Sequence, residues 1–382
     1  MPNVDVAIIG AGPAGSATAI ALAQRGYEIA LIDRKNFPRE KLCGDFVNPI
    51  NRPILRRLGV ESEIHALQHA KVTGFRITST SGAAAEARFP SAAQGPMAGL
   101  GLRRASLDHT LVRQAASLDA AVRLNSRVEA LSRNARGWRF KIGEESWQAK
   151  FLIGADGRNS WVAEQLDLNR RAGMRGRSVG FQARLKGSRA AQGKVEIHLF
   201  PGGYAGLVGL GGGELNLCMA IERRMLPRAA TSEFLLERCL PRNPYLKDVL
   251  QRSAAISPFR SAYPVYFSPR RCYAERALLV GDAARVSEPV TGEGIYFAMR
   301  GGLLAAQVIA EALAVNDLSA GFLRRYEQSC ERMFRNRMSL NALMRFAVYR
   351  PALLSPLVRL LARKRGWLDS VIGAVCAPEP LP

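Results

Sequence analysis

Three glycines and an aspartate near the N-terminus have the spacing of a dinucleotide-binding site. Gly10, Gly12 and Gly15 follow an apolar, β-branched run over residues 4 to 9, and Asp33 ends a second apolar run. Such glycines allow a tight turn and a close approach of pyrophosphate to the backbone, and a carboxylate about 20 residues later accepts ribose hydroxyls. We therefore expect FAD or NAD, because the Asp33 carboxylate would repel the 2′-phosphate of NADP.

Two more aspartates stand where apolar runs end abruptly. Asp156 follows residues 151 to 155, and Asp282 follows residues 277 to 281. The loop after Asp282 contains Gly292 and leads into a helix of small residues that is expected to begin near Gly294 and Ile295. N–H groups at such a helix start suit a pyrimidine oxygen of a reduced, anionic flavin. The Asp282 carboxylate is placed to accept hydrogen bonds from a ribityl chain.

Basic and thiol side chains occur in the same loops. Arg34 comes directly after Asp33, where its planar guanidinium is placed to lie over an adenine ring, and Arg104 opens an amphipathic helix. Cys43 and Gly44 lie in a loop rich in turn residues, which is placed to run under the rest of a long cofactor. Cys43 has two interpretations: a small buried packing residue, or a thiol that donates a proton or takes part in redox chemistry.

These residues require two kinds of scaffold. Residues 4 to 33 have the pattern of strand, glycine turn, helix and strand that is typical of a doubly wound α/β domain. Between residues 178 and 221, four apolar strands follow one another with only turns between them, which favours an antiparallel sheet and marks a second domain. The glycine-rich stretch at residues 206 to 213 precedes a strand rather than a helix, so no second nucleotide-binding domain is predicted.

Composition excludes several classes of protein. The 382 residues are 48% hydrophobic, enough for a large core divided into two domains. The six cysteines form no CxxC pair, and His65 and His69 have no evident third ligand, so neither a disulfide framework nor a metal site is predicted. The first strand begins too near Met1 for a leader, and no apolar run reaches the roughly 18 residues of a membrane span. We therefore expect a cytoplasmic protein.

The chain is strongly basic, with a formal net charge of +22. Such a charge suits an anionic membrane, an anionic substrate or nucleic acid, or else reflects an arginine-rich solvated surface. Because no nucleic-acid motif, basic tail or alternation of basic and aromatic residues is present, nucleic acid is the least favoured partner. The sequence does not indicate an oligomeric state.

Taken in order, the motifs resemble those of the FAD-dependent oxidoreductases built like p-hydroxybenzoate hydroxylase. That superfamily contains aromatic, squalene and ubiquinone-pathway monooxygenases, flavin halogenases and geranylgeranyl reductases. The resemblance covers roughly residues 1 to 325. It rests on the glycine motif with Asp33, on Arg104 with Leu107 and Asp108, on Asp156 with Gly157, and on Gly281 and Asp282 followed by Pro289 and residues 292 to 295.

Within this superfamily, residues 41 to 44 (Lys-Leu-Cys-Gly) are similar to the Lys-x-Cys-Gly of geranylgeranyl reductases. The Pro-x-x-Tyr-x-Trp-x-Phe-Pro motif of those reductases is kept only in part. Pro201 and Tyr204 are present, but the large residues are replaced by Gly206, Val208 and Gly209. The Trp-x-Trp-x-Ile-Pro of the halogenases is absent, which argues against halogenation.

The resemblance implies an α/β fold with interleaved domains. Residues 1–70, 98–165 and 272–325 would form a Rossmann-like FAD-binding domain, residues 71–97 and 166–271 an antiparallel-sheet substrate domain, and residues 326–382 a C-terminal helical segment. It places the pyrophosphate at residues 12 to 15, adenine near Val128 and the flavin ring near Ile295. The implied cofactor-binding residues are Gly10, Gly12, Pro13, Ala14, Gly15, Asp33, Arg34, Cys43, Gly44, Arg104, Val128, Asp156, Asp282, Gly292, Gly294 and Ile295.

The resemblance also implies an activity. FAD would reduce a carbon–carbon double bond of a lipophilic small molecule, with Cys43 as the candidate acid. NAD(P)H would serve as a transient reductant, because no domain is built to hold it. One alternative is an NAD(P)H-dependent flavin monooxygenase that hydroxylates or epoxidises an aromatic, polyketide or isoprenoid substrate. A second is an FAD carrier without turnover.

The C-terminal segment mixes arginines with apolar residues. Residues 323 to 382 contain eleven basic residues against four acidic ones. The pattern favours amphipathic helices broken at Pro351 and Pro356. It has two interpretations: a lid packed over the substrate domain, or peripheral attachment to the anionic cytoplasmic face of a membrane, which would deliver the lipophilic substrate.

Overall fold

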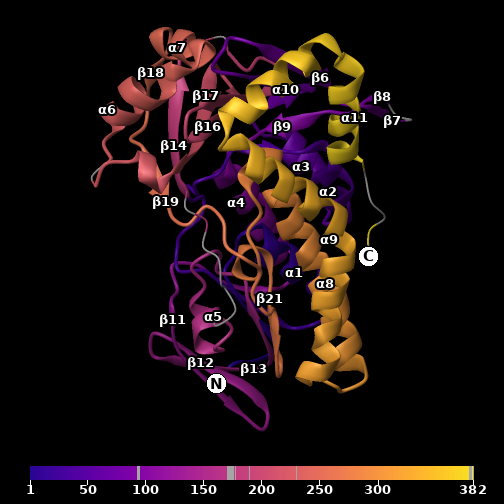
Figure 1. The fold of residues 1–382 in the computed structure, drawn as a ribbon. Helices are drawn as coiled ribbons and strands as arrows, with labels where there is room; N and C mark the ends of the chain where they lie inside the picture. The colour runs from indigo at the N-terminus through magenta and orange to yellow at the C-terminus, as the bar shows by residue number, and fades with distance from the viewer. Residues whose placement is uncertain are drawn as a thin grey trace.

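The computed structural model describes residues 1–92, 95–169, 176, 178–188, 190–228, 230–377 and 381. Its fold is mixed α/β, as the sequence predicts. Two large sheets make up the two halves of the molecule, and long helices run along one side of both (Figure 1). We call the half with the glycine motif the nucleotide half and the other the substrate half.

The sheet of the nucleotide half joins segments from three regions of the chain. Parallel pairing connects β1 to β2 and β13, β2 to β10, and β13 to β21, while β11, β12 and β13 are antiparallel neighbours. Its strands are β10 (Ala121–Arg123), β2 (Ile29–Ile32), β1 (Asn3–Ile9), β13 (Glu145–Gly154), β12 (Gly137–Ile142), β11 (Val128–Asn134), β21 (Ala277–Leu279) and β20 (Tyr273–Ala274).

The apolar runs of the sequence become the centre of this sheet. Val6, Ala7 and Ile8 of β1 have no exposed surface, as expected for a parallel strand that is covered on both faces. Helix α1 (Pro13–Ala23) follows the glycine loop and is buried over residues 13 to 22. It contacts β1, β2 and the long helix α8 (Gly294–Ala314), so small side chains are needed on several of its faces.

One glycine sets how closely α1 and α8 approach. A Cβ on Gly302 of α8 would lie 2.6 Å from the Ala14 carbonyl oxygen and 2.9 Å from Thr18 Oγ1. We expect Gly302→Ala to lower the free energy of unfolding by about 1–3 kcal/mol, the usual effect of overpacking. Urea unfolding measures this change. Gly373→Ala is the control, because no atom lies within 4 Å of a Cβ there, and a loss of the same size in that variant would contradict the packing explanation.

The sheet of the substrate half is built mainly from consecutive strands. Strands β14 to β17 pair antiparallel, as predicted, but β15 also pairs in parallel with β5, so the sheet is mixed. The earlier segment that carries β5 and β6 joins beside β15, a pairing that no local pattern shows. In order the strands are β18 (Ala254–Ala255), β14 (Ser178–Lys186), β17 (Glu214–Glu222), β16 (Gly203–Gly211), β15 (Lys194–Phe200), β5 (Gly74–Thr78) and β6 (Ala84–Arg88), with β19 (Arg260–Ala262) beside β14.

A small sheet connects the halves. Its strands are β3 (Phe46–Val47), β9 (Gly99–Gly101) and β4 (Ala70–Val72), and a separate pair is formed by β7 (Ser91–Ala92) and β8 (Gly95–Pro96). A Cβ on Gly101 would lie only 1.8 Å from the Gly209 carbonyl oxygen of β16, so the two backbones touch directly. The loop that contains Cys43 leads into β3 and is held at this junction.

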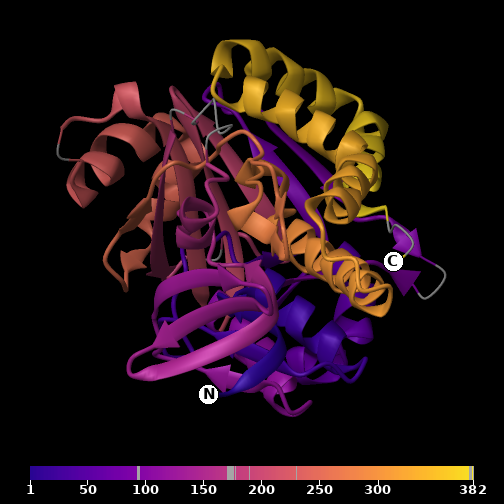
Figure 2. The same cartoon turned by 90° about the horizontal axis from the view of Figure 1, so that it is seen from below.

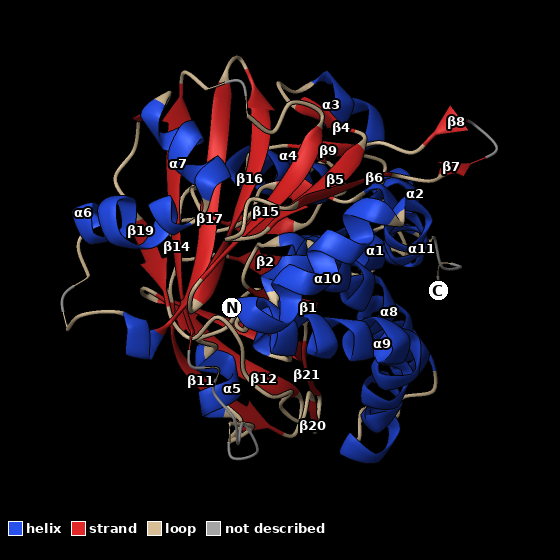
Figure 3. Ribbon diagram, turned by 45° about the horizontal axis from the view of Figure 1, so that its top comes forward, coloured by secondary structure: helices blue, strands red, loops and turns tan. Residues whose placement is uncertain are grey.

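Helices flank both sheets (Figure 3). Besides α1 and α8 they are α2 (Arg52–Arg57), α3 (Glu61–Ala66), α4 (Arg104–Ala116), α5 (Trp161–Gln165), α6 (Ser232–Phe234), α7 (Pro244–Gln251), α9 (Ala320–Val348), α10 (Pro351–Arg363) and α11 (Arg365–Cys376). Shorter helical turns span Pro49–Asn51, Arg223–Met225, Leu235–Cys239, Leu240–Arg242, Gly281–Ala283 and Pro289–Thr291.

The C-terminal helices pack against the substrate half. Both α10 and α11 contact β6, and in Figures 1 and 2 these yellow helices lie over the indigo strands of the early chain. Leu354, Val358, Leu368 and Ile372 are buried in one cluster with residues of β5, β6 and β15. Helices α10 and α11 therefore form a lid over this part of the substrate half.

Several sequence expectations need correction. Pro356 does not break a helix, since α10 continues through it. The interruption falls instead at residue 364, between α10 and α11. The expected boundary after residue 325 falls inside α9, which runs from the nucleotide half to the lid.

The expectation about apolar runs was also wrong. Among the described residues, α8 is long and apolar enough to cross a membrane by length and composition, judged over a window of 18 residues. That window is 72% buried inside the protein. Because α8 packs between α1 and α9, it is a core helix of this fold.

Candidate active site

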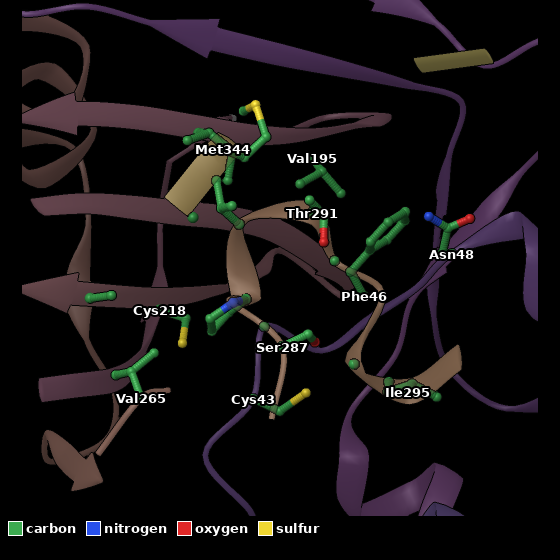
Figure 4. A pocket seen from close by; sticks show the side chains of 18 of the residues that line it. Cys43, Phe46, Asn48, Val195, Cys218, Val265, Ser287, Thr291, Ile295 and Met344 are labelled. Atoms are coloured by element: carbon green, nitrogen blue, oxygen red, sulfur yellow. The ribbon is translucent and has the colours of Figure 1, made fainter. Parts of the chain in front are cut away.

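A cavity of about 530 Å³ is lined by residues of both halves and of the lid. The glycine loop, the loop of residues 39–48 and the start of α8 line it on the nucleotide side, and strands β15 to β17 line it on the substrate side. In Figure 4, Cys43, Cys218, Phe46 and Met344 surround one space although they come from distant segments.

The three motif glycines have different tasks. Gly10 has a φ of +106°, and a Cβ there would lie 2.4 Å from the Ala155 carbonyl oxygen. A Cβ on Gly15 would lie 1.9 Å from the Gly10 carbonyl oxygen. Gly12 is extended (φ −76°, ψ −178°), and the nearest atom to its Cβ position is Arg39 Nη2 at 3.6 Å. Gly10 and Gly15 therefore hold the loop closed, whereas Gly12 leaves space in the cavity.

Asp33 is fixed at the edge of this loop. Its Oδ2 accepts a hydrogen bond from the Ala11 N–H at 2.9 Å, and its Oδ1 accepts one from the Lys35 N–H at 2.9 Å. Asp33 is buried, lines the cavity and lies 3.5 Å from Arg39 Nη2. The backbone thus orients the carboxylate, which keeps further lone pairs for ribose hydroxyls.

Basic side chains gather beside the glycine loop. Those that line the cavity are Arg39, Lys41, Arg104 and Arg158. Arg104 donates two hydrogen bonds of 2.8 Å to Asp108, and Arg39 Nη1 lies 3.3 Å from the same carboxylate. Burial, with help from the neighbouring guanidiniums, lowers the pKa of Lys41 against the opposing charge of Asp282. A bound polyanion would offset this repulsion.

Two helices direct their N-termini at the cavity. Pro13 and Ala14 of α1 line it, as do Gly294 and Ile295 of α8. The N-cap residues, Gly12 and Glu293, make no side-chain hydrogen bond to these first turns, so N–H groups there are available to an anion or a carbonyl oxygen. The cavity therefore meets two helix starts that suit an anion: that of α1, after the glycine motif, and that of α8, after the Gly292 loop.

The two remaining aspartates differ. Asp282 lines the cavity, its side chain is 37% exposed, and Arg158 Nη2 lies 3.8 Å from its carboxylate. The Asp156 carboxylate accepts hydrogen bonds from Ser160 Oγ at 2.5 Å and from the Val162 N–H at 3.1 Å. Asp156 therefore borders the cavity but its carboxylate caps α5, whereas Asp282 has an accessible carboxylate.

Cys43 lies where the nucleotide side of the cavity meets the substrate sheet. Its carbonyl oxygen accepts hydrogen bonds from Gln182 Nε2 and Asn216 Nδ2, both at 2.9 Å. Burial raises the pKa of the Cys43 thiol, and the adjacent Arg104 guanidinium only partly opposes this. At neutral pH the group is therefore a thiol that carries a proton, held by its backbone in a fixed position.

A family model described as an FAD binding domain matches residues 3–339. The chain belongs to this FAD-binding family. It is an FAD-dependent oxidoreductase, which confirms the superfamily expected from the motifs.

Named relatives cover most of the chain. It is 28% identical over 381 residues to conditioned medium factor receptor 1 of Dictyostelium discoideum, across 95% of this chain and 74% of that protein. It is 28% identical over 339 residues to digeranylgeranylglycerophospholipid reductase 1 of Methanothermobacter thermautotrophicus, across 86% and 82%. The solved structure of pqsL, a probable FAD-dependent monooxygenase from Pseudomonas aeruginosa, superposes with a TM-score of 0.74 at 17% identity, across 93% and 99%, which shows a shared fold.

The residues of the cavity fit FAD. The open side of Gly12 and the start of α1 would hold the pyrophosphate together with the basic side chains, and Asp33 would hold the ribose. Asp282 would hold the ribityl chain, and the start of α8 would meet the pyrimidine side of the flavin ring. When bound, FAD supplies hydride-transfer chemistry, and these residues orient it.

Most of the sequence-predicted residues come together at this site. Three do not line the cavity: Gly15 packs beneath the loop, Arg34 is exposed, and Val128 is buried in the core of the nucleotide half. Sequence reasoning assigned no role to Arg39 or Arg158. Each stands within six residues of a predicted site residue, but no local sequence pattern shows which arginine of a loop points into the cavity.

A buried polar network holds the Cys43 loop, and it centres on Asp45. This residue has a φ of +54° and no exposed surface. Its carboxylate accepts a hydrogen bond from the Arg104 N–H at 3.0 Å and pairs with Arg184, which also lies 3.2 Å from Glu40. Burial raises the pKa of Asp45 to about 6, although Arg184 opposes the shift. The network joins both halves through one carboxylate.

The titration of Asp45 has a measurable consequence. A carboxyl whose pKa is raised by folding stabilises the folded state when protonated, and this contribution is lost as pH rises through about 6. We expect the stability of the wild type relative to Asp45→Asn to fall by about 2 kcal/mol between about pH 4.5 and about pH 7. Urea unfolding of both proteins across this range measures it. A difference that is constant or grows with pH would show that Arg184 keeps Asp45 ionised.

Two groups of hydrogen bonds, around Glu288 and around Arg337, attach the lid to the cavity wall. Tyr204 of β16 and Tyr349 after α9 both donate to Glu288 Oε1, at 2.6 and 3.1 Å, and burial raises the pKa of Glu288. Arg337 of α9 donates to Glu293 at 2.6 Å, beside the start of α8, and to the carbonyl oxygens of residues 375 and 377. The end of α11 is therefore tied to the loop expected to meet the flavin.

Proposed function

We propose that this oxidoreductase reduces a carbon–carbon double bond of a lipophilic substrate, with NAD(P)H as the transient reductant. The observation that carries the proposal is the position of Cys43, a protonated thiol between the FAD-binding loops and an apolar chamber of the same cavity. The chamber side chains include Phe75, Ile77, Phe89, Val195, Ile197, Leu207, Met219, Leu340, Met344, Leu354 and Leu361. An apolar chamber of this kind favours a hydrocarbon chain over a polar substrate.

The departures from the reductase motif support a bulky substrate. Gly206 and Val208 line the cavity where the motif has large aromatic residues, and Tyr204 lines it as well. The nearest side-chain atom to a Cβ on Gly206 is Ile197 Cδ1, at 3.6 Å. Small residues here leave chamber volume for substrate. The similarity to digeranylgeranylglycerophospholipid reductases supports a polyprenyl chain as the group reduced.

The chain's own residues would supply the proton. Reduction of a double bond adds a hydride to one carbon and a proton to the other. Cys43 would give its thiol proton to the second carbon, and solvent would then reprotonate the thiolate. The Arg104 guanidinium, which lies beside the thiol, would stabilise the negative sulfur in the meantime. The lid would exclude bulk water during transfer.

A flavin monooxygenase is the second candidate. The shared fold with pqsL supports it, and so does the apolar chamber, because oxygen chemistry on a flavin also needs a dry site. A monooxygenase mechanism gives the Cys43 thiol no role, and we therefore place this function second. A carrier without turnover has no use for the apolar chamber.

One experiment separates these functions. FAD-loaded protein is mixed with NADH or NADPH and digeranylgeranylglycerophospholipid, with and without oxygen, and product masses are recorded. We expect the gain of two hydrogens per double bond without oxygen. Gain of one oxygen atom, and only in its presence, would establish the monooxygenase instead. Unchanged lipid under both conditions would count against both with this substrate.

A further inference from the structure

Exposed apolar side chains concentrate on α10, α11 and the end of α9. Of the eleven large apolar side chains that are exposed among the described residues, seven lie between residues 343 and 371. We call these seven the lid surface: Leu343, Phe346, Leu353, Leu357, Leu360, Trp367 and Val371. Their exposed fractions run from 39% to 62%. Exposed apolar side chains that gather in one part of a folded protein mark an interaction site.

The packing of the lid does not explain this surface. The inner sides of α10 and α11 already bury Leu354, Val358, Leu368 and Ile372 against the substrate half. A helix on the surface of a globular protein normally has one apolar side and one polar side. On these helices the exposed leucines and tryptophan stand roughly a quarter turn from the buried residues, so the apolar side is wider than the packing against the substrate half requires. The uncovered part of that side is available to a second apolar environment.

The lid surface is also the rim of the cavity. Leu343, Leu357, Trp367 and Val371 are exposed to solvent and at the same time line the cavity. A hydrocarbon chain that enters between them meets apolar side chains from the outside to the chamber.

The charges along the lid surface are mostly basic, and the exposed Asp369, between Trp367 and Val371, is the acidic exception on α11. Between Glu331 and Asp369 the sequence contains no acidic residue. Arg350, Arg359, Arg363 and Lys364 are exposed there. The Arg350 guanidinium lies 3.9 Å from the ring centre of Phe346, and Lys364 Nζ lies 5.1 Å from that of Trp367. Cations beside outward-facing aromatic rings match the boundary between acyl chains and anionic headgroups.

We propose that the lid surface docks on an anionic lipid membrane and that its rim is the entrance through which a membrane-dissolved substrate reaches the chamber. Charge complementarity selects this occupant over a second copy of the chain, because two copies would bring the same basic residues together. The docking does not depend on the reaction, whereas the entrance role rests on the proposed function.

Vesicle sedimentation of the FAD-loaded full chain tests the docking. We expect binding to phosphatidylcholine vesicles that contain phosphatidylglycerol, weak binding to pure phosphatidylcholine, and release at high salt. Arg359→Gln/Arg363→Gln/Lys364→Gln is expected to weaken partitioning roughly a hundredfold, since each surface cation contributes about fivefold. Equal binding to both kinds of vesicle, or unchanged binding by this variant, would overturn the proposal.

A second variant removes the apolar contribution of the lid surface to docking. Phe346→Ser/Leu353→Ser/Leu360→Ser changes exposed residues that do not line the cavity, and Ile256→Ser/Val315→Ser is the matched control on other exposed positions. We expect only the first to lose vesicle binding, with FAD content kept in both. If instead the wild type without lipid sediments as a dimer and the first variant as a monomer, a second copy covers this surface and the proposal is wrong.

The entrance role has its own readout. With substrate in anionic vesicles, the serine variant of the lid surface is expected to turn over at least tenfold more slowly than the wild type, and with substrate in detergent micelles equally fast. If the serine variant and the wild type had equal rates in vesicles, the entrance role would be rejected. The docking itself would still be judged by the sedimentation experiment. If neither protein turns over any lipid, the proposed reaction fails and the docking measurement still stands.

Discussion

Gly12→Val is expected to abolish FAD binding while the protein stays folded. The backbone at Gly12 is extended, a conformation open to any residue, and the nearest atom to a Cβ is Arg39 Nη2 at 3.6 Å. A valine therefore meets no backbone obstacle. Its methyl groups would occupy the space in front of the first N–H groups of α1, where the pyrophosphate has to lie.

The expected effect is large. Each hydrogen bond to a charged group contributes about 1.5–3 kcal/mol, and we expect the valine to block two such bonds from the start of α1 to the pyrophosphate. A loss of about 3–6 kcal/mol corresponds to a Kd for FAD that rises more than a hundredfold. The ratio of flavin to protein after gel filtration measures it, and the chromophore that acid releases from the wild type should be FAD.

Gly15→Ala gives the contrasting control. A Cβ at that position would overlap the Gly10 carbonyl oxygen at 1.9 Å, so this variant should lose thermal stability together with FAD. Gly12→Val should unfold at the temperature of the wild-type apoprotein. Retention of FAD by Gly12→Val would contradict the assignment of the glycine loop to the pyrophosphate.

Local patterns sufficed to predict the part of the site that depends on strand ends. Gly10, Gly12 and Asp33 are recognisable because an apolar run, a turn and a helix follow one another within about 25 residues. The same holds for Asp282 and the start of α8. A parallel strand buried on both faces leaves its carboxyl end as the place where polar groups can meet a ligand.

Contacts between distant segments were not predictable. Asp45 and Arg184 are 139 residues apart, and the Cys43 carbonyl meets Asn216 173 residues away, so no spacing reveals either. The prediction that Pro356 ends a helix was wrong because a local rule was applied where packing decides. The local rule that proline ends a helix is overruled here by Leu354 and Val358, which are buried against the substrate half and hold α10 in place.

Cys43→Ala is expected to lower reductive turnover by about two to four orders of magnitude, the usual contribution of a general acid. FAD content should not change, because Gln182 and Asn216 hold the Cys43 carbonyl rather than its side chain. Single-turnover reduction of substrate under anaerobic conditions measures the effect without interference from oxygen. Turnover equal to that of the wild type would make Cys43 a packing residue.

Cys218→Ala is the matched control for this variant, and pH provides a further test. Cys218 lines the same cavity, and burial raises the pKa of its thiol too, but it is not beside Arg104 at the junction with the FAD-binding loops. We expect it to keep most of the turnover. Because burial raises the pKa of Cys43, the wild-type rate should fall only above the ordinary pKa of a thiol, as the proton is lost. Cys43→Ala should lack this alkaline limb, since its residual rate no longer depends on a protonated thiol. An alkaline limb that persists in Cys43→Ala would assign the proton to another group.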